Sequence, residues 1–202
     1  MFLIYEDLCS NIKIKCKYDN IIDKIFISKF INNYIYVLRY ASFNGYYKIV
    51  KLLLKDKQVD PSVDDNYVLR HTSANGYYKI VKLLLKDKRV DPSVDDNLAL
   101  KYASENGYYK IVKLLLKDKR VDPSDDDNYS IDFASYYGYY KIVKLLLKDK
   151  RVDPSVDDNL AITYAFKHEH YKVVKLLLKD KRIDKNDQII KNIINKMKNI
   201  KY

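Results

Sequence analysis

The sequence has no tryptophan and, among its 202 residues, only four glycines, four prolines, three histidines, two methionines and two cysteines. Cys9 and Cys16 are too few for a four-ligand zinc site, so we expect free buried thiols in a reducing compartment. Four glycines and three histidines cannot supply a serine–histidine–aspartate set or a glycine-rich phosphate loop, so we expect no catalytic residue, cofactor or metal. No apolar run is long enough to cross a membrane, and the five-residue run before Glu6 and Asp7 is too short for a secretory signal.

The net charge of +11 is unevenly distributed along the chain. Residues 36–159 carry 22 Lys/Arg against 19 Asp/Glu, and residues 1–35 carry five against four. Residues 160–202 carry 11 against four, so most of the basic excess belongs to the C-terminal part. The central part is nearly neutral because lysine-rich segments alternate with aspartate-rich ones.

What the sequence has in abundance is repetition. The segment Gly-Tyr-Tyr-Lys-Ile-Val-Lys-Leu-Leu-Leu-Lys-Asp-Lys recurs every 31 residues from Gly45, Gly76, Gly107 and Gly138, with a diverged fifth copy at Glu169. A fixed period of this size predicts a solenoid, in which each repeat packs on its neighbours. Solenoids offer long surfaces to partners more often than they form catalytic pockets, so we expect a protein that is not an enzyme.

Each repeat predicts two helices joined by a tight turn. In the copy at 67–97, a first helix over 68–75 places Leu69, Thr72 and Ser73 on one face, and Gly76 ends it in a left-handed conformation. A second helix follows over 78–86. It is predicted to bury Ile80, Val81, Leu83, Leu84 and Leu85 and to expose Lys79, Lys82 and Lys86.

The loop after the second helix has its own signals. Asp87-Lys88-Arg89 places cations near the negative end of the helix dipole. Pro92 fixes its own φ and restricts the residue before it, so residues 90–93 are expected to form a turn. Asp95-Asp96-Asn97 is then expected to supply N-cap oxygens for the first helix of the next repeat.

The pattern Leu-x-x-Thr/Ala-Ser-x-Asn-Gly-Tyr-x-Lys-Ile-Val-x-Leu-Leu-Leu resembles the ankyrin repeat. The Asp-Pro-Ser loop and the Asn-Gly-Tyr-Tyr-Lys-Ile-Val run resemble especially the ankyrin arrays of mimivirus-like giant viruses. The resemblance implies an all-α ankyrin solenoid of stacked helix–turn–helix units over about residues 36–184. The family's Thr-Pro-Leu-His tetrapeptide is replaced, for example by Tyr67-Val68-Leu69-Arg70, so its Thr–His hydrogen bonds cannot form. The unit is also two residues shorter than the ankyrin period, so we expect the projecting β-finger to be reduced to a turn.

The expected domains are an N-terminal capping region at 1–35 (a degenerate half-repeat), five ankyrin repeats and a basic C-terminal capping helix at 185–202. Apolar residues at helical spacing over 187–200 favour this last helix. The five repeats are 36–66, 67–97, 98–128, 129–159 and 160–184.

The first helices vary between copies at the two positions before each glycine, whereas the second helices are almost invariant. In the family that the chain resembles, these two positions face the concave groove and often contact a partner. The resemblance therefore implies a protein–protein interaction scaffold, aided by the asparagines that open each first helix; drift after recent duplication is the competing explanation. The predicted partner-binding residues are Phe43, Asn44, Asn66, Ala74, Asn75, Asn97, Glu105, Asn106, Asn128, Tyr136, Tyr137, Asn159, Lys167 and His168.

Three other patterns have two interpretations each. The tyrosine pairs could anchor a partner, but a structural ladder is favoured because the first tyrosine replaces a bracing histidine of the family. The lysine columns on the second helices, with the basic C-terminus, give the alternative function of binding nucleic acid or an anionic surface. Nearby aspartates favour a solvated face instead. His168-Glu169-His170 resembles a metal cluster only superficially, because residues i and i+2 of a helix do not face together.

The partner expected from these patterns is a host or viral protein, bound by a monomer in the host cytoplasm or nucleus without a membrane. An adaptor for a ubiquitin ligase is disfavoured, because residues 1–35 are short for such a module and lack its leucine-proline opening.

Overall fold

The structure, a computed structural model, describes residues 34–198 and residue 200. The predictions for Cys9 and Cys16 and for the N-terminal half-repeat up to residue 33 lie outside these residues. Every regular element in the described part is a helix, and it contains no strand, so the all-α prediction is confirmed and the loops are turns rather than β-fingers. The chain divides into two compact units between Asp60 and Pro61.

The described part of the first unit is a single helix pair. Helix α3 spans Tyr34–Phe43, and α4 spans Tyr47–Leu53. Leu38 on α3 and Val50 on α4 are completely buried, so the pair packs through the faces that the apolar spacing predicts.

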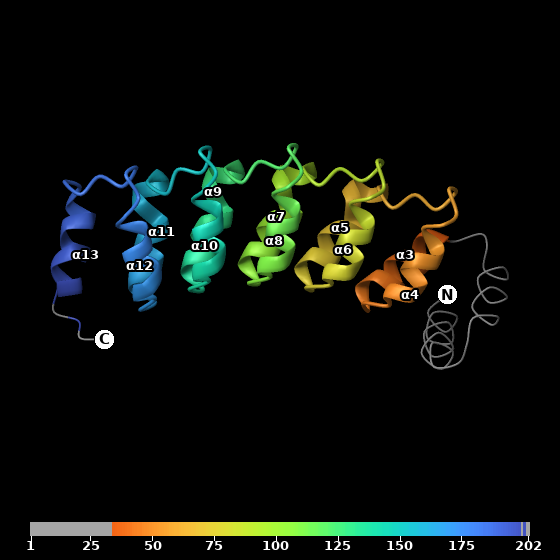
Figure 1. Cartoon of the computed structure of the whole chain (residues 1–202), viewed down its shortest axis with the longest axis horizontal. Coiled ribbons are helices and arrows are strands. Elements are labelled where there is room, and N and C mark those ends of the chain that lie inside the picture. Colours follow the sequence, from red (N-terminus) through yellow and green to blue (C-terminus); the bar gives the residue numbers. More distant parts are fainter. Residues whose placement is uncertain (1–33, 199, 201–202) are drawn as a thin grey trace. The chain divides into compact units, whose positions relative to one another are not determined.

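The second unit repeats this pair four times and ends in one further helix (Figure 1). The first helices of the repeats pack side by side in one layer, and the second helices pack in another, which confirms the predicted stacking of helix–turn–helix units. The elements are α5 (Val63–Ala74), α6 (Tyr78–Leu84), α7 (Val94–Glu105), α8 (Tyr109–Leu115), α9 (Asp125–Tyr136), α10 (Tyr140–Leu146), α11 (Val156–Lys167), α12 (Tyr171–Leu177) and α13 (Gln188–Lys198).

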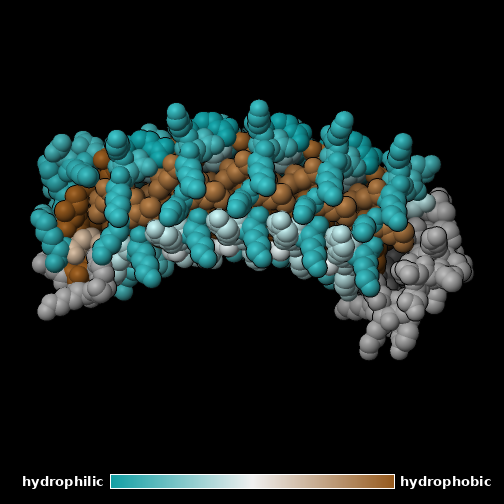
Figure 2. All heavy atoms as spheres, in the orientation of Figure 1, coloured by the Kyte–Doolittle hydropathy of each residue, from teal (hydrophilic) through white to brown (hydrophobic). Residues whose placement is uncertain are grey.

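The second helices bury less than the sequence predicts. Ile80, Val81 and Leu84 are buried as predicted, but Leu83 and Leu85 are only half-buried. The reason is length: α6 has seven residues and ends at Leu84, so it presents one buried stripe rather than a broad face. Figure 2 shows the result as hydrophobic side chains lying between rows of projecting hydrophilic ones.

The tight turn between the two helices depends on glycine for two reasons. Gly107 has a φ of +77°, which confirms the predicted left-handed stop and which a residue with a Cβ rarely adopts. The ring of Tyr139, one repeat further on, also lies against it, and a Cβ at Gly107 would come within 2.6 Å of the Tyr139 Cζ. Tyr108 lies over Gly76 in the same way. Tyr108 and Tyr139, each the first tyrosine of its pair, are therefore part of a structural ladder, the interpretation that the sequence favours.

The prediction that Asp95-Asp96-Asn97 caps a helix is wrong. The three residues have φ values of 50°, 51° and 58°, so the right-handed part of α7 begins only after Asn97. Asn97 Oδ1 accepts from the backbone N–H of Asp122 rather than from an N–H of its own helix. The three residues form a short left-handed segment, which aspartate and asparagine tolerate better than other residues with a Cβ. The same three positive φ values recur at residues 64–66, 126–128 and 157–159.

The asparagine of each left-handed segment joins its repeat to the next one. The backbone N–H of Asp122 donates to Asn97 Oδ1 at 3.0 Å, and that of Asp153 donates to Asn128 Oδ1 at 3.0 Å. Asn159 ends the series, because its buried Oδ1 accepts no hydrogen bond in the described part of the chain. These asparagine hydrogen bonds all run in one direction, because the side chain of each of the other asparagines accepts from a backbone N–H of the repeat that follows.

An arginine after each second helix of the second unit stabilises the loop, whereas Gln58 takes its place after α4. In the third repeat, Arg120 holds Asp118 with two contacts, Nε to Oδ1 at 3.0 Å and Nη2 to Oδ2 at 2.7 Å. This pair lowers the pKa of Asp118. Arg120 Nη2 also donates to the carbonyl oxygen of Val90 in the preceding repeat at 3.3 Å.

The helix predicted over 187–200 is present as α13. Asp187 Oδ1 caps it by accepting from the backbone N–H groups of Ile189 and Ile190, at 2.8 and 3.1 Å. Ile190 and Ile193 are buried, and α13 packs beside α11. The helix therefore covers the apolar side that the fifth repeat would otherwise expose.

One column of serines weakens the fold. Ser73, Ser104 and Ser135 are completely buried, and their hydroxyl oxygens have no hydrogen-bond partner among the described residues. Because an unpaired buried hydroxyl costs more than it contributes, Ser104→Ala should raise the free energy of unfolding by about 1 kcal/mol. Urea denaturation followed by circular dichroism measures this change. A loss of stability in Ser104→Ala would show that the hydroxyl is paired in solution.

Candidate functional site

The predicted pair of variable positions lies at the C-terminal ends of the first helices. In the second and third repeats, the asparagine of the pair is a helix cap: Asn75 Nδ2 donates to the His71 carbonyl oxygen at 2.8 Å, and Asn106 Nδ2 donates to that of Tyr102 at 2.9 Å. Asn44 does the same in the first unit, where the Phe43 beside it is 53% exposed. These asparagines are exposed or half-buried, but their amides already serve the helix ends.

The four asparagines predicted to aid binding at the entrances of the first helices are in the core instead. Their exposed fractions range from 2% to 8%. The side chains of the first three accept the hydrogen bonds that join successive repeats. They do not belong to an accessible surface, because the left-handed segment turns them inward. The residues are Asn66, Asn97, Asn128 and Asn159.

Tyr136 is the centre of an aromatic surface in the fourth and fifth repeats. Its ring centroid lies 4.8 Å from that of Tyr137 and 4.1 Å from that of His168. Tyr164 of α11 meets it edge-on, at 5.3 Å and an interplanar angle of 89°. The structure therefore brings together three predicted residues, Tyr136, Tyr137 and His168, and adds Tyr164, which the sequence analysis missed.

Further rings extend this surface along α9. Phe133 stacks on Tyr129 with centroids 4.1 Å apart and lies 6.2 Å from Tyr136. A helix places residues three and four apart on one face, so the spacing from Tyr136 back to Phe133 and Tyr129 could have identified both. We define the aromatic cluster as Tyr129, Phe133, Tyr136, Tyr137, Tyr139, Tyr164, His168 and His170.

The fold does not require the central rings of this cluster. The position of Tyr136 is filled by Ala74 in the second repeat and by Glu105 in the third, and that of Tyr137 by asparagine. Tyr137 is 44% exposed, although aromatic side chains gain most when they are buried. Lys167, the remaining predicted residue of the fifth repeat, is exposed at the edge of the cluster.

The N-terminal edge of the cluster is tied to the third repeat. The Tyr129 hydroxyl donates to Glu105 Oε2 at 3.2 Å. Burial, followed by the charge of Glu105, raises the pKa of Tyr129 to about 12, so its hydroxyl stays protonated at neutral pH. Glu105 thus lies beside the aromatic cluster, as an acidic neighbour rather than a separate site.

One buried carboxyl lies on the same helix. Asp132 is 4% exposed, and burial, together with the charges of Asp157 and Asp127, raises its pKa to about 8. Helix α9 thus carries rings of the aromatic cluster and also a buried carboxyl that is mostly protonated at neutral pH.

His170 is structural rather than a metal ligand. It takes the place of the ladder tyrosine, its ring lies against Gly138, and its Nε2 is 2.9 Å from the Tyr136 carbonyl oxygen. Within the described part of the chain, no three His, Cys, Asp or Glu side chains are grouped so that they could hold a metal ion.

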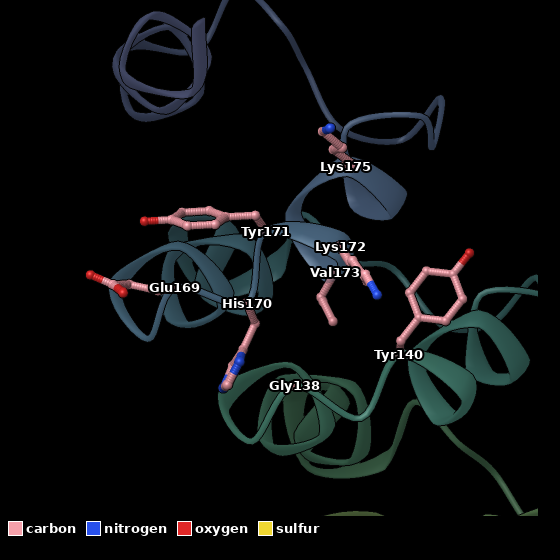
Figure 3. A pocket seen from close by; sticks show the side chains of 8 residues that line it. All are labelled: Gly138, Tyr140, Glu169, His170, Tyr171, Lys172, Val173 and Lys175. Atoms are coloured by element: carbon pink, nitrogen blue, oxygen red, sulfur yellow. The ribbon is translucent and has the colours of Figure 1, made fainter. Parts of the chain in front are cut away.

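A pocket of about 590 Å³ lies between α10 and α12 (Figure 3). His170 takes the position of a larger tyrosine in the other repeats, and Val173 takes that of an isoleucine. Tyr140 and Lys172 project beside it in the close-up. The residues that line it are Gly138, Tyr140, Glu169, His170, Tyr171, Lys172, Val173 and Lys175.

The lysine columns lie on the second helices and are exposed, as predicted. Lys79 and Lys82 are examples, and neither forms an ion pair with another described residue. The arrangement suits a solvated face as well as an anionic ligand, so binding of nucleic acid stays a prediction. None of the helices in the described part has the length and apolar character needed to span a membrane.

Comparison with known proteins gives one family. A model described as ankyrin repeats (3 copies) matches residues 38–127 and 123–189, which is most of the chain. No curated protein matches the sequence. The two matched segments cover the repeats that the 31-residue period defines, with their paired helices and glycine turns. The chain is therefore a member of the ankyrin-repeat family.

Proposed function

We propose that this chain is a non-enzymatic scaffold that binds a protein partner through the aromatic cluster of its fourth and fifth repeats. The observation that carries the proposal is the group of rings around Tyr136, which the scaffold does not need. Tyr137 is exposed, and the other rings of the group are half-buried. Ankyrin repeats generally mediate protein–protein interactions, and tyrosines grouped on a rigid surface are the side chains that most often dominate the affinity of such interfaces.

The rest of the predicted surface supports this site rather than competing with it. Ala74, Glu105 and Lys167 occupy corresponding positions in different repeats of the second unit, so a partner longer than the aromatic cluster would meet different chemistry along this unit. Phe43 occupies the same position in the first unit. A host or viral origin of the partner, a monomeric state and a cytoplasmic or nuclear location stay predictions from the sequence.

The test replaces central rings by residues that the scaffold already carries elsewhere. In Tyr136→Ala with Tyr137→Asn, the fourth repeat acquires the Ala-Asn pair of the second repeat, so the variant should fold. Proximity labelling in the native cell identifies proteins next to the wild-type chain, and each is then tested as a purified protein by calorimetry. Loss of two interface anchors should weaken binding about 100-fold or more.

The matched control is Tyr140→Ala, which removes an exposed tyrosine on α10 outside the cluster. It should bind as the wild type does, and both variants should keep the wild-type circular dichroism spectrum. Equal binding by the wild type and the double variant would exclude the aromatic cluster as the interface.

A further inference from the structure

Successive first helices carry a charged residue that reaches forward to the start of the next first helix. In the second repeat, Arg70 Nη1 lies 2.6 Å from Asp95 Oδ2, and in the third, Lys101 Nζ lies 2.8 Å from Asp126 Oδ2. Asp95 and Asp126 occupy the same position of the left-handed segment, one repeat apart. The cation therefore neutralises an aspartate whose place the backbone fixes.

The fourth repeat breaks this series. Asp132 occupies the position of Arg70 and Lys101, and Asp157 occupies the position of Asp95 and Asp126. Two carboxyls thus stand where the preceding repeats have a cation and a carboxylate. Among the described residues, neither Asp132 nor Asp157 forms an ion pair or a hydrogen bond through its side chain.

The surroundings of this place are acidic and open toward solvent. Asp157 and Asp127 are both exposed, while Asp132 below them is buried. In the third repeat, Lys101 Nζ also lies 5.8 Å from the centroid of the Tyr129 ring, between that ring and the carboxylate. Leu160 occupies the sequence position of this ring in the fifth repeat, so the equivalent place has a leucine and two carboxyls.

We propose that a lysine or arginine side chain of the protein partner inserts between Asp132 and Asp157, where Lys101 would lie in the preceding repeat. The inference rests on the proposed function, because the aromatic cluster on the same helix would hold the partner segment that carries the cation. Tyr136 lies four residues after Asp132 on α9, so the segment should combine one basic residue with adjacent apolar residues. A side chain with a long stem suits a carboxyl this deeply buried.

A phage-displayed library of random dodecapeptides, selected on the full chain, tests the inference with peptides in place of the unidentified partner. Enriched peptides should share a lysine or arginine next to an aromatic or aliphatic residue. Synthetic copies should bind Asp132→Lys about 100-fold more weakly, because this variant supplies the missing cation and fills the place. Asp157→Asn should also weaken binding, whereas Asp158→Asn, a neighbouring exposed aspartate outside the pair, should not.

Affinity should also rise by about tenfold between pH 6 and pH 9, because ionised Asp132 attracts the cation and protonated Asp132 does not. Asp132→Asn should remove this pH dependence. Peptides that lack a basic residue, or that bind Asp132→Lys as they bind the wild type, would overturn the inference. If those peptides still lose binding with Tyr136→Ala and Tyr137→Asn, the proposed function stands alone; if neither set of substitutions matters, both proposals fail.

Discussion

Raising the pH from 5 to 9 should lower the free energy of unfolding by about 4 kcal/mol, because Asp132 must ionise inside the array. The pKa of this carboxyl is about 8 in the folded chain and 3.8 in an unfolded reference. Between these values, the folded state binds the proton more strongly than the unfolded state does. Stability contributed by the proton is therefore complete below pH 4 and is lost progressively as the pH rises toward 8.

Asp132→Asn should remove most of this pH dependence, since an amide has no proton to lose in this range. At pH 9, the variant should be more stable than the wild type by about 4 kcal/mol, which is large compared with the usual stability of a folded domain. Urea denaturation at pH 5, 7 and 9, followed by circular dichroism, measures the difference.

The control for Asp132→Asn is Asp158→Asn, which removes an exposed charge of the same repeat junction. It should leave the pH dependence of the free energy of unfolding unchanged. Aspartates that are paired with an arginine do not titrate between pH 5 and 9, so they do not contribute to the predicted change in this range. The pKa of Asp118 is lowered by its hydrogen bond to Arg120, and those of Asp87, Asp149 and Asp180 are lowered in the same way. The contribution of these ion pairs to the free energy of unfolding is present above pH 4 and is lost only at lower pH. A wild-type chain equally stable at pH 5 and 9 would contradict the prediction.

Gly107→Ala should destabilise the array by about 3 kcal/mol, because two costs coincide at one position. Alanine at a φ of +77° is strained, and its Cβ would lie 2.6 Å from the ring of Tyr139. Thermal and urea denaturation measure the total. Asn106→Ala, at the preceding position, removes only an exposed cap and should cost clearly less.

A double-mutant cycle with Tyr139→Ala separates the two costs at Gly107. If the ring contributes, Gly107→Ala should cost less by about 1 kcal/mol or more when residue 139 is already alanine. The remaining cost is that of the backbone. Strict additivity would show that the ring moves aside and that the positive φ explains the whole effect.

The opposite substitution, from a residue with a side chain to glycine, can be made at Glu169. It occupies the glycine position of the fifth repeat with a φ of 61°, its side chain is exposed, and α13, the next helix, has no aromatic residue that could lie against it. Glu169→Gly should stabilise the chain by about 1 kcal/mol, the backbone part alone. The contrast between Glu169 and Gly107 shows why the glycine is kept only where a ring follows.

The repeat architecture could be predicted from the sequence because its signals are local and recur at one period. The glycine stop, the paired helices and the C-terminal helix α13 follow from spacing alone. The left-handed Asp95-Asp96-Asn97 segment could not be predicted, because the same residues are good N-caps and nothing nearby distinguishes the two uses. The deciding hydrogen bond comes from Asp122, 25 residues away from Asn97.

Only part of the candidate site could be predicted from the sequence, because the prediction relied on differences between the copies. Comparison of the copies identified Tyr136 and Tyr137, whose positions vary most visibly. Phe133 and Tyr164 were missed because their own column, which includes His71 and Tyr102, is aromatic throughout and resembles packing. Asp132 was missed because its significance depends on Asp157 at the start of α11, a pairing that becomes visible only when the helices are stacked.

The unused acceptor on Asn159 bears on how the length of this protein can change. Each 31-residue unit brings one asparagine acceptor and one backbone donor in the loop that follows, so inserting or deleting a whole unit keeps every remaining junction paired. A partial unit would misplace all later donors at once. The copy number is therefore the property that tandem duplication can alter with least effect on folding, and it sets how many binding positions the array presents.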